Sequence, residues 1–128
     1  MLALKREKFM ITIAIITVSD RSSQGKREDV SGPAIRSWAE SKGYMVRNEI
    51  VVPDELGEIK TALVECSDAG IDLILTTGGT GFAARDVTPE ATIAVIEKNV
   101  PGFAEVMRMK SLEITPHAML SRAVSGIR

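Results

Sequence analysis

The chain has 128 residues, of which 45% are hydrophobic and 26% are charged, and its formal net charge is −1. This length and composition are typical of one globular domain with its own hydrophobic core. The lack of a basic surplus argues against nucleic-acid binding, and the longest apolar run, Met10–Val18, is too short to span a bilayer. The single cysteine, Cys66, excludes an internal disulfide and a cysteine-based zinc site, and it favours a reducing, cytoplasmic compartment.

The domain is expected to comprise residues 10–128, behind an N-terminal extension of residues 1–9. The charges of Lys5–Lys8 follow a short uncharged start, which is the wrong order for a signal peptide. The apolar and β-branched run Met10–Val18 predicts a central strand that is covered on both faces. The polar segment Ser19–Asp29 has no periodicity and predicts a mobile surface loop.

A helix is expected to begin at Ser31, a suitable N-cap residue, with Pro33 in its first turn and Gly43 at its end. Trp38 lies on the apolar face of this helix and is expected in the core. The next segment, Tyr44–Val52, alternates between apolar and charged residues, which predicts a half-exposed strand at a sheet edge. Its apolar side would carry Tyr44, Val46, Ile50 and Val52, and its charged side Arg47 and Glu49.

Further helices and a third strand follow. Apolar residues at helical spacing predict a helix over Glu55–Asp68, with Cys66 in the core. Leu73–Thr77 is expected to form a buried strand, and further helices should span Thr88–Lys98 and begin near Pro101. The residues expected to face inward from the last helix are Phe103, Val106 and Met107.

The alternation of strands and helices predicts an α/β open sheet with parallel strands. The first and third strands are apolar and the second alternates, so the expected spatial order is second, first, third. Ligands bind to such sheets outside the carboxyl ends of the strands, where the connections reverse direction. Ser19 and Asp20 would therefore face Thr77–Gly81 across one pocket, with Asp54 at the same end.

A glycine-rich loop ends the third strand. Gly78, Gly79 and Gly81 have no side chains, so backbone N–H groups could approach a bulky anionic ligand. Asp86 follows and could hold a metal ion that bridges to the phosphates of that ligand. The loop is not a Walker P-loop, because no Gly-Lys-Ser/Thr follows the glycines. Taken alone, it is equally compatible with an ordinary strand–turn–helix connection.

Three carboxylates, Asp20, Asp54 and Asp86, are expected at this end of the sheet. Each has a structural alternative: Asp20 as a turn former, Asp54 as a helix N-cap and Asp86 as a brace for its loop. Together, beside a glycine-rich loop, they favour a site for magnesium and phosphate. His117, the only histidine, has no evident partner, so neither a Ser-His-Asp triad nor a zinc site is expected.

Four segments carry a resemblance to a known family: Thr76-Thr-Gly-Gly-Thr-Gly81, Arg85-Asp-Val-Thr-Pro-Glu-Ala-Thr92, Pro101-Gly-Phe-Ala-Glu-Val-Met107 and Leu120-Ser-Arg-Ala-Val-Ser-Gly-Ile-Arg128. They look like the MoaB/Mog family of molybdenum-cofactor biosynthesis proteins, whose domain also occurs in gephyrin. The resemblance implies a three-layer α/β/α molybdopterin-binding domain that forms a homotrimer or homohexamer. It also implies a molybdopterin adenylyltransferase that uses Mg²⁺, transfers AMP from ATP to the terminal phosphate of molybdopterin, and releases pyrophosphate.

Matched by position, the resemblance implies that Asp54 and Asp86 are the catalytic and Mg²⁺-binding residues. The substrate-binding residues that it implies are Ser19, Asp20, Thr77, Gly78, Gly79, Thr80, Gly81 and Ser111. The alternative function is a non-catalytic molybdopterin-binding protein or scaffold domain of the same fold. Family members continue past Ser125–Arg128 with another strand, a loop and closing helices, so the usual C-terminal part is expected to be missing here.

Overall fold

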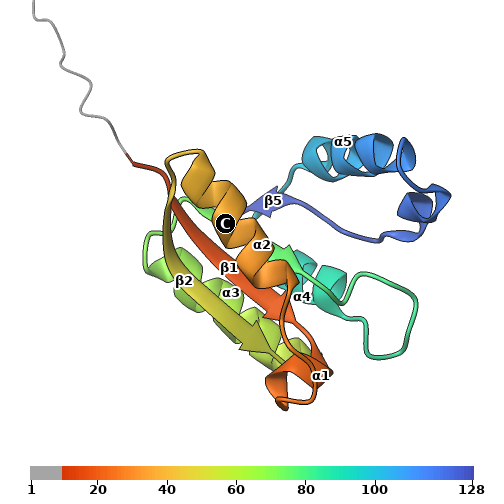
Figure 1. Ribbon diagram of the computed structural model, residues 1–128, viewed down its shortest axis with the longest axis horizontal. Coiled ribbons are helices and arrows are strands. Elements are labelled where there is room, and N and C mark those ends of the chain that lie inside the picture. The colour runs from red at the N-terminus through yellow and green to blue at the C-terminus, as the bar shows by residue number, and fades with distance from the viewer. Residues whose placement is uncertain (1–9) are drawn as a thin grey trace, which may run out of the picture.

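The computed structural model describes residues 10–128, so the expected N-terminal extension, residues 1–9, lies outside the described residues. Figure 1 shows the arrangement of the helices and strands. The strands are β1 (Thr12–Val18), β2 (Met45–Val52), β3 (Leu73–Thr77), β4 (Lys98–Asn99) and β5 (Gly126–Ile127). The helices are α1 (Asp20–Ser23), α2 (Ser31–Ser41), α3 (Leu56–Asp68), α4 (Thr88–Val95), α5 (Pro101–Leu112) and the 3₁₀ helix η1 (Pro116–Leu120).

The main sheet has three strands in the order β2-β1-β3, and β1 pairs in parallel with both neighbours. The central residues 13–16 of β1 have no exposed surface, because both faces of this strand are covered. β2 lies at the edge, where its alternating sequence leaves half of it exposed. The spatial order that the apolar pattern predicts is confirmed, and so is the α/β class.

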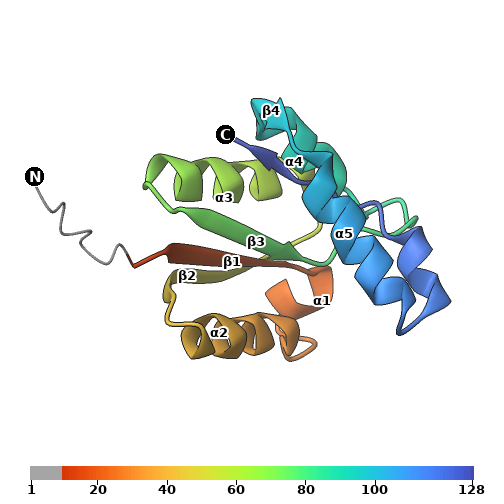
Figure 2. The same cartoon turned by 90° about the horizontal axis from the view of Figure 1, so that it is seen from above.

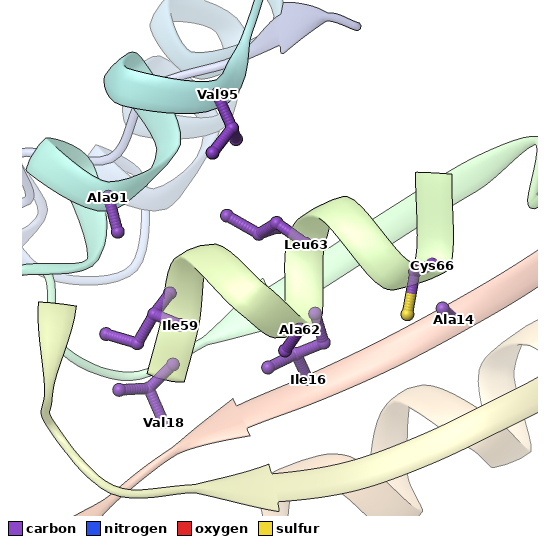
Figure 3. Packing of buried hydrophobic residues seen from close by; sticks show 9 residues of the cluster. All are labelled: Ala14, Ile16, Val18, Ile59, Ala62, Leu63, Cys66, Ala91 and Val95. Carbon is purple, nitrogen blue, oxygen red and sulfur yellow. The ribbon is translucent and has the colours of Figure 1, made fainter. Parts of the chain in front are cut away.

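Helices cover both faces of the sheet, which gives three layers (Figure 2). On one face α2 packs over a small cluster of Ile13, Ile15 and Ala39. On the other face α3 and α4 contribute to a larger cluster (Figure 3). Cys66 belongs to this larger cluster, as predicted, and its burial raises the pKa of the thiol. The larger cluster comprises Ala14, Ile16, Val18, Ile59, Ala62, Leu63, Cys66, Ala91 and Val95.

The prediction that the four apolar residues of this segment lie on one face of the sheet is wrong, because β2 contains a bulge. The register against β1 shifts between Ile13 and Ala14, and this leaves Arg47 as an extra residue in β2. An extra residue reverses the faces of all residues beyond it, because strand side chains alternate with a period of two. The four apolar residues are therefore divided: Tyr44 and Val46 pack on the α2 side, and Ile50 and Val52 on the α3 side.

Two predictions about α2 are wrong in detail. The helix begins at Ser31, but the Asp29 carboxylate accepts the N–H of Gly32 at 3.1 Å, and no side chain of the N-cap position forms a cap. Trp38 is 46% exposed, and its ring meets Tyr44 edge to face with 5.9 Å between centroids. Helical periodicity predicts which side of a helix a residue lies on, but it does not predict how deeply that residue is buried. Trp38 can therefore follow the apolar pattern and still lie at the edge of the core.

The segment after β3 also departs from the expected pattern. The predicted helix to Lys98 ends at Val95, because Lys98–Asn99 pair with β5. In α5 only Ala104 is buried, whereas the residues predicted to face inward are 55 to 69% exposed. α5 packs beside η1 rather than on the main sheet (Figure 2).

None of the helices in residues 10–128 combines the length and apolar character that crossing a bilayer requires.

Candidate functional site

The carboxyl ends of β1 and β2 are joined by reciprocal hydrogen bonds. The N–H of Asp20 donates to Asp54 Oδ2 at 2.8 Å, and the N–H of Asp54 donates to Asp20 Oδ1 at 2.9 Å. Ser19 is the N-cap of the short helix α1, and its hydroxyl oxygen accepts the N–H of Ser22 at 3.2 Å. The segment predicted as a mobile loop therefore starts with an ordered turn that holds Asp20 against Asp54.

Arg85 binds one of these two carboxylates, that of Asp20, and also Glu55, although no sequence pattern assigned it a role. Its guanidinium donates to both oxygens of Asp20, at 2.6 and 3.0 Å, and to Glu55 at 2.8 Å. These bonds, and then the backbone N–H of Asp54, hold the pKa of the Asp20 carboxyl below its ordinary value. Within residues 10–128, Asp20 thus has a cationic partner, whereas neither Asp54 nor Asp86 has one. The sequence signals for Arg85 are its place directly before Asp86 and its position as the first residue of a family motif.

We expect Arg85→Gln to raise the pKa of Asp20, because the variant loses both the cation and its forked hydrogen bonds. A lowered folded-state pKa stabilises the fold above the unfolded-state pKa, and this contribution disappears as the pH falls through the folded-state value. The variant should therefore be less stable than the wild type at neutral pH, and this difference should become smaller at low pH. Carboxyl-carbon NMR titration measures the Asp20 pKa directly.

The matched control is Arg36→Gln, which removes a guanidinium that also bridges two carboxylates, Glu40 and Glu49, but on α2 and β2. It should leave the titration of Asp20 unchanged. An unaltered Asp20 pKa in Arg85→Gln would contradict the assignment of Arg85 as its main partner.

The structural alternative for Asp54 is wrong, while that for Asp86 is partly confirmed. The N-cap of α3 is Glu55, and no side chain caps that helix. The Oδ2 atom of Asp86 accepts the N–H of Ala83 at 3.0 Å and so braces its loop. In residues 10–128, the Oδ1 atoms of Asp54 and Asp86 accept no hydrogen bond from the protein. Each carboxylate therefore keeps one oxygen for a further partner.

The glycine loop, Gly78–Gly81, has four consecutive carbonyl groups that two residues hold. Thr88 binds the first two, through its hydroxyl at 2.9 Å and its backbone N–H at 3.1 Å. Arg122 binds the other two, through its backbone N–H at 2.9 Å and its Nε at 2.8 Å. Arg122 also donates to the carbonyl of Asp86 at 2.8 Å and pairs with Glu90. No sequence pattern predicts this role of Arg122, although the residue lies within one of the family motifs.

These bonds determine where the N–H groups of the loop point. In a trans peptide the carbonyl and the next N–H point in opposite directions, and residues 10–128 contain no cis peptide bond. The N–H groups of residues 79–82 therefore point away from Thr88 and Arg122. None of these four N–H groups donates a hydrogen bond to another atom of residues 10–128. The loop thus has four consecutive N–H groups without a partner in residues 10–128, and backbone N–H groups of this kind can bind an anion.

The glycines themselves are required by packing within the protein. Gly78 and Gly79 have φ values of +94° and +70°, which disfavour other residues. A Cβ on Gly78 would lie 2.2 Å from the carbonyl oxygen of Val18, and one on Gly79 would lie 2.2 Å from Thr88 Oγ1. The prediction that the missing side chains make room for a ligand is therefore corrected at these two positions. The space beside Gly78 and Gly79 that a side chain would need is filled by the protein itself.

One pocket of about 250 Å³ brings together Thr77, Gly78, Thr80 and Ser111. Ser111 comes from α5, so the pocket lies between the glycine loop and the C-terminal part of the chain. Its other lining residues are Thr76, Ala104, Met107, Arg108, Ala118, Ser121 and Ala123. The remaining candidates, Ser19, Asp20, Asp54, Gly79, Gly81 and Asp86, do not line it. A wider hollow of about 930 Å³ between β2 and α3 contains none of the candidate residues.

The donor set at Asp54 and Asp86 fits one kind of magnesium site. The two carboxylates flank the glycine loop, since Asp54 Oδ1 would lie 3.3 Å from a Cβ on Gly79, and Asp86 Oδ2 2.7 Å from a Cβ on Gly81. Residues 10–128 contain no cluster of three or more ligating side chains. Magnesium is commonly held by one or two carboxylates together with substrate phosphates and water. Both residues therefore suit an ion that arrives with a nucleotide.

Known proteins resemble this chain over nearly its whole length. The family model of a probable molybdopterin-binding domain matches residues 14–127. The molybdopterin adenylyltransferase of Helicobacter pylori strain J99 is 45% identical over 123 residues, which cover 92% of this chain and 69% of that protein. Gephyrin of Dictyostelium discoideum is 41% identical over 134 residues, which cover 97% of this chain and 18% of that protein.

The fold is equally close to a solved structure. The crystal structure of the molybdopterin biosynthesis enzyme MoaB from Thermus thermophilus has a TM-score of 0.87 at 47% identity, over 93% of this chain and 76% of that one. The chain spans 62 to 69% of the length of the bacterial adenylyltransferases from Helicobacter pylori and Haemophilus influenzae. The resemblance seen in the sequence motifs is confirmed by these matches. This chain therefore belongs to the family of probable molybdopterin-binding domains.

Proposed function

We propose that the protein acts in molybdenum cofactor biosynthesis as a molybdopterin adenylyltransferase that uses Mg-ATP. An oxygen of the terminal phosphate of molybdopterin attacks the α-phosphorus of ATP and forms a new phosphoanhydride bond. The bond from the α-phosphorus to the bridging oxygen breaks, and pyrophosphate leaves with that oxygen. Nucleotidyl transfer of this kind depends mainly on positioning and charge neutralisation, so it requires no nucleophile from the protein.

The glycine loop is the observation that carries this proposal. Its four carbonyls are bound by Thr88 and Arg122, and its free N–H groups suit the negative charge of a phosphate. The adjoining pocket adds the hydroxyl groups of Thr80 and Ser111 and the apolar side chain of Met107. Such a mixture of apolar wall and a few polar groups is typical of a site for a ring system that carries a charged group.

Asp54 and Asp86 are proposed to hold the magnesium ion that accompanies ATP. When bound, the ion neutralises charge on the phosphates of ATP and of the leaving pyrophosphate. The protein's own part is to fix both carboxylates: Asp20 binds Asp54, and the N–H of Ala83 binds Asp86. Ser19 and Asp20 would border the nucleotide, since they lie directly beside Asp54.

The decisive experiment is incubation of the protein with Mg-ATP and molybdopterin, followed by detection of adenylylated pterin and pyrophosphate. Formation of both products in equal amounts would support the enzyme. Pterin binding without turnover would select the alternative, a molybdopterin-binding protein or a scaffold domain of the same fold. The names of the bacterial relatives favour the enzyme over this alternative.

We further propose that residues 10–128 form a single cytoplasmic domain that assembles into a homotrimer or homohexamer. Several large apolar side chains of α5 and η1 are exposed, which is typical of a surface covered by another chain. They are Phe103, Val106, Met109 and Met119. Sedimentation should show three or six copies, and Phe103→Glu should dissociate them. A monomer in the unmodified protein would refute this assembly.

A further inference from the structure

Arg108 is the one cationic residue that lines the pocket beside the glycine loop. It comes from the middle of α5 and is half-buried. Its Nη1 atom donates to the carbonyl oxygen of Ala123 at 2.7 Å and makes a longer contact of 3.5 Å with Ser121. These bonds hold the guanidinium against the segment that follows η1. Ser121 and Ala123 line the same pocket, so these bonds connect two of its walls.

Most of the hydrogen-bonding capacity of Arg108 is unused. In residues 10–128, its Nε and Nη2 atoms donate to no protein atom, and no carboxylate lies within salt-bridge distance. No acidic residue lines the pocket either. A partly buried guanidinium with unused donors and no counter-ion is a suitable partner for an anionic ligand, because part of its hydration is already lost. By contrast, Arg36, Arg85 and Arg122 each bind a carboxylate.

We propose that Arg108 binds the phosphate monoester of the acceptor substrate, together with the free N–H groups of the glycine loop. This inference rests on the proposed function, because it names the residue that would recognise the group to be adenylylated. A guanidinium presents parallel N–H donors in a fixed fork that matches two oxygens of one phosphate. The nearby hydroxyl groups of Thr80 and Ser111 could accept or donate one more bond each.

Inorganic phosphate is the first probe, because its binding can be measured without turnover. We expect it to shift the amide NMR signals of residues 79–82. Arg108→Gln should weaken phosphate binding by at least about tenfold, since a charge-assisted hydrogen bond is lost. Arg108→Lys should bind phosphate with an affinity between those of the wild type and Arg108→Gln. Lysine keeps the positive charge but lacks the two parallel N–H donors of the guanidinium. Wild-type protein without these shifts, or Arg108→Gln with unchanged binding, would overturn the inference.

Lys110→Gln is the matched control, because it removes a positive charge from the same helix at an exposed position that does not line the pocket. It should change phosphate binding by less than about twofold. Equal weakening in Lys110→Gln and Arg108→Gln would mean that only general charge attraction is measured, and this too would overturn the inference. Thermal unfolding of each variant shows whether the bond to Ala123 matters for folding. If Arg108→Gln does not fold, the comparison of Arg108→Lys with Lys110→Gln decides the question.

Steady-state kinetics separates this inference from the proposed function. If the enzyme adenylylates molybdopterin, Arg108→Gln should raise the KM for molybdopterin at least about tenfold and leave the KM for ATP unchanged. Turnover with an unchanged KM for molybdopterin would refute the role of Arg108 and preserve the enzyme. Phosphate binding that depends on Arg108, without any adenylylation, would preserve the anion site and refute the enzyme.

Discussion

Asp86→Asn is expected to lower the rate of AMP transfer by at least about 100-fold, with little change in the affinity for molybdopterin. The amide has nearly the same shape and can still accept the N–H of Ala83, so the loop should keep its structure. What is lost is the negative charge beside the glycine loop that would hold magnesium. Single-turnover AMP transfer measures the rate, and equilibrium titration with molybdopterin measures the affinity.

Asp54→Asn should behave in the same way, because the new amide can still accept the N–H of Asp20. The free energy of unfolding should change by no more than about 1 kcal/mol in either variant, since no buried contact is removed. Asp72→Asn is the control: its carboxylate also accepts a backbone N–H, that of Thr12, but at the opposite end of the sheet. It should transfer AMP at the wild-type rate. Full activity in well-folded Asp54→Asn and Asp86→Asn would show that these two residues do not hold the metal ion.

The layered fold could be predicted because its strongest signals are local. The unbroken apolar run Met10–Val18 indicates a strand with both faces covered, and the alternation in Tyr44–Val52 indicates an edge. Those two observations fix the strand order, and the strand order fixes which loops meet. Asp20 and Asp54 could be placed together for this reason, although they are far apart in the sequence.

Contacts between side chains could not be predicted in the same way. The bulge at Arg47 inserts one residue without any proline or glycine to indicate it, and it reverses the faces of the residues that follow. Arg122 holds the glycine loop from more than 30 residues away, and no periodicity connects the two. The role of Arg85 could not be predicted for a related reason. The sequence shows that Arg85 is next to Asp86, but it does not show that its guanidinium binds Asp20.

The sequence also could not predict how deeply individual side chains are buried. Trp38 is 46% exposed, and the residues that were expected to face inward from α5, Phe103, Val106 and Met107, are 55 to 69% exposed. The hydrophobic pattern of a helix identifies the side that is removed from water, but it does not identify what covers that side. A core, a second chain and a substrate all require the same pattern. This is why Ser111 and Arg108, which line a pocket on α5, could not be distinguished by periodicity from neighbours that face solvent.

Gly78→Ala is expected to destabilise the protein by about 3 kcal/mol. Part of this comes from the φ value of +94°, which an alanine adopts at a cost. The larger part comes from the new Cβ, which would lie 2.2 Å from the carbonyl oxygen of Val18, at the carboxyl end of β1. Backbone cannot move aside as a flexible side chain can, so β1 and β3 would have to separate. Thermal and chemical unfolding measure the change in free energy.

Gly43→Ala isolates the two contributions. Gly43 has a similar φ of +79°, but a Cβ there would meet no atom within 4 Å, so only the backbone cost of about 1 kcal/mol should appear. The difference between the variants then measures the close approach of Gly78 to Val18. Equal destabilisation would show that the glycine loop can withdraw from β1 without loss. In that case the hydrogen bonds from Thr88 and Arg122 would be enough to hold the loop beside the pocket that Arg108 and Ser111 line.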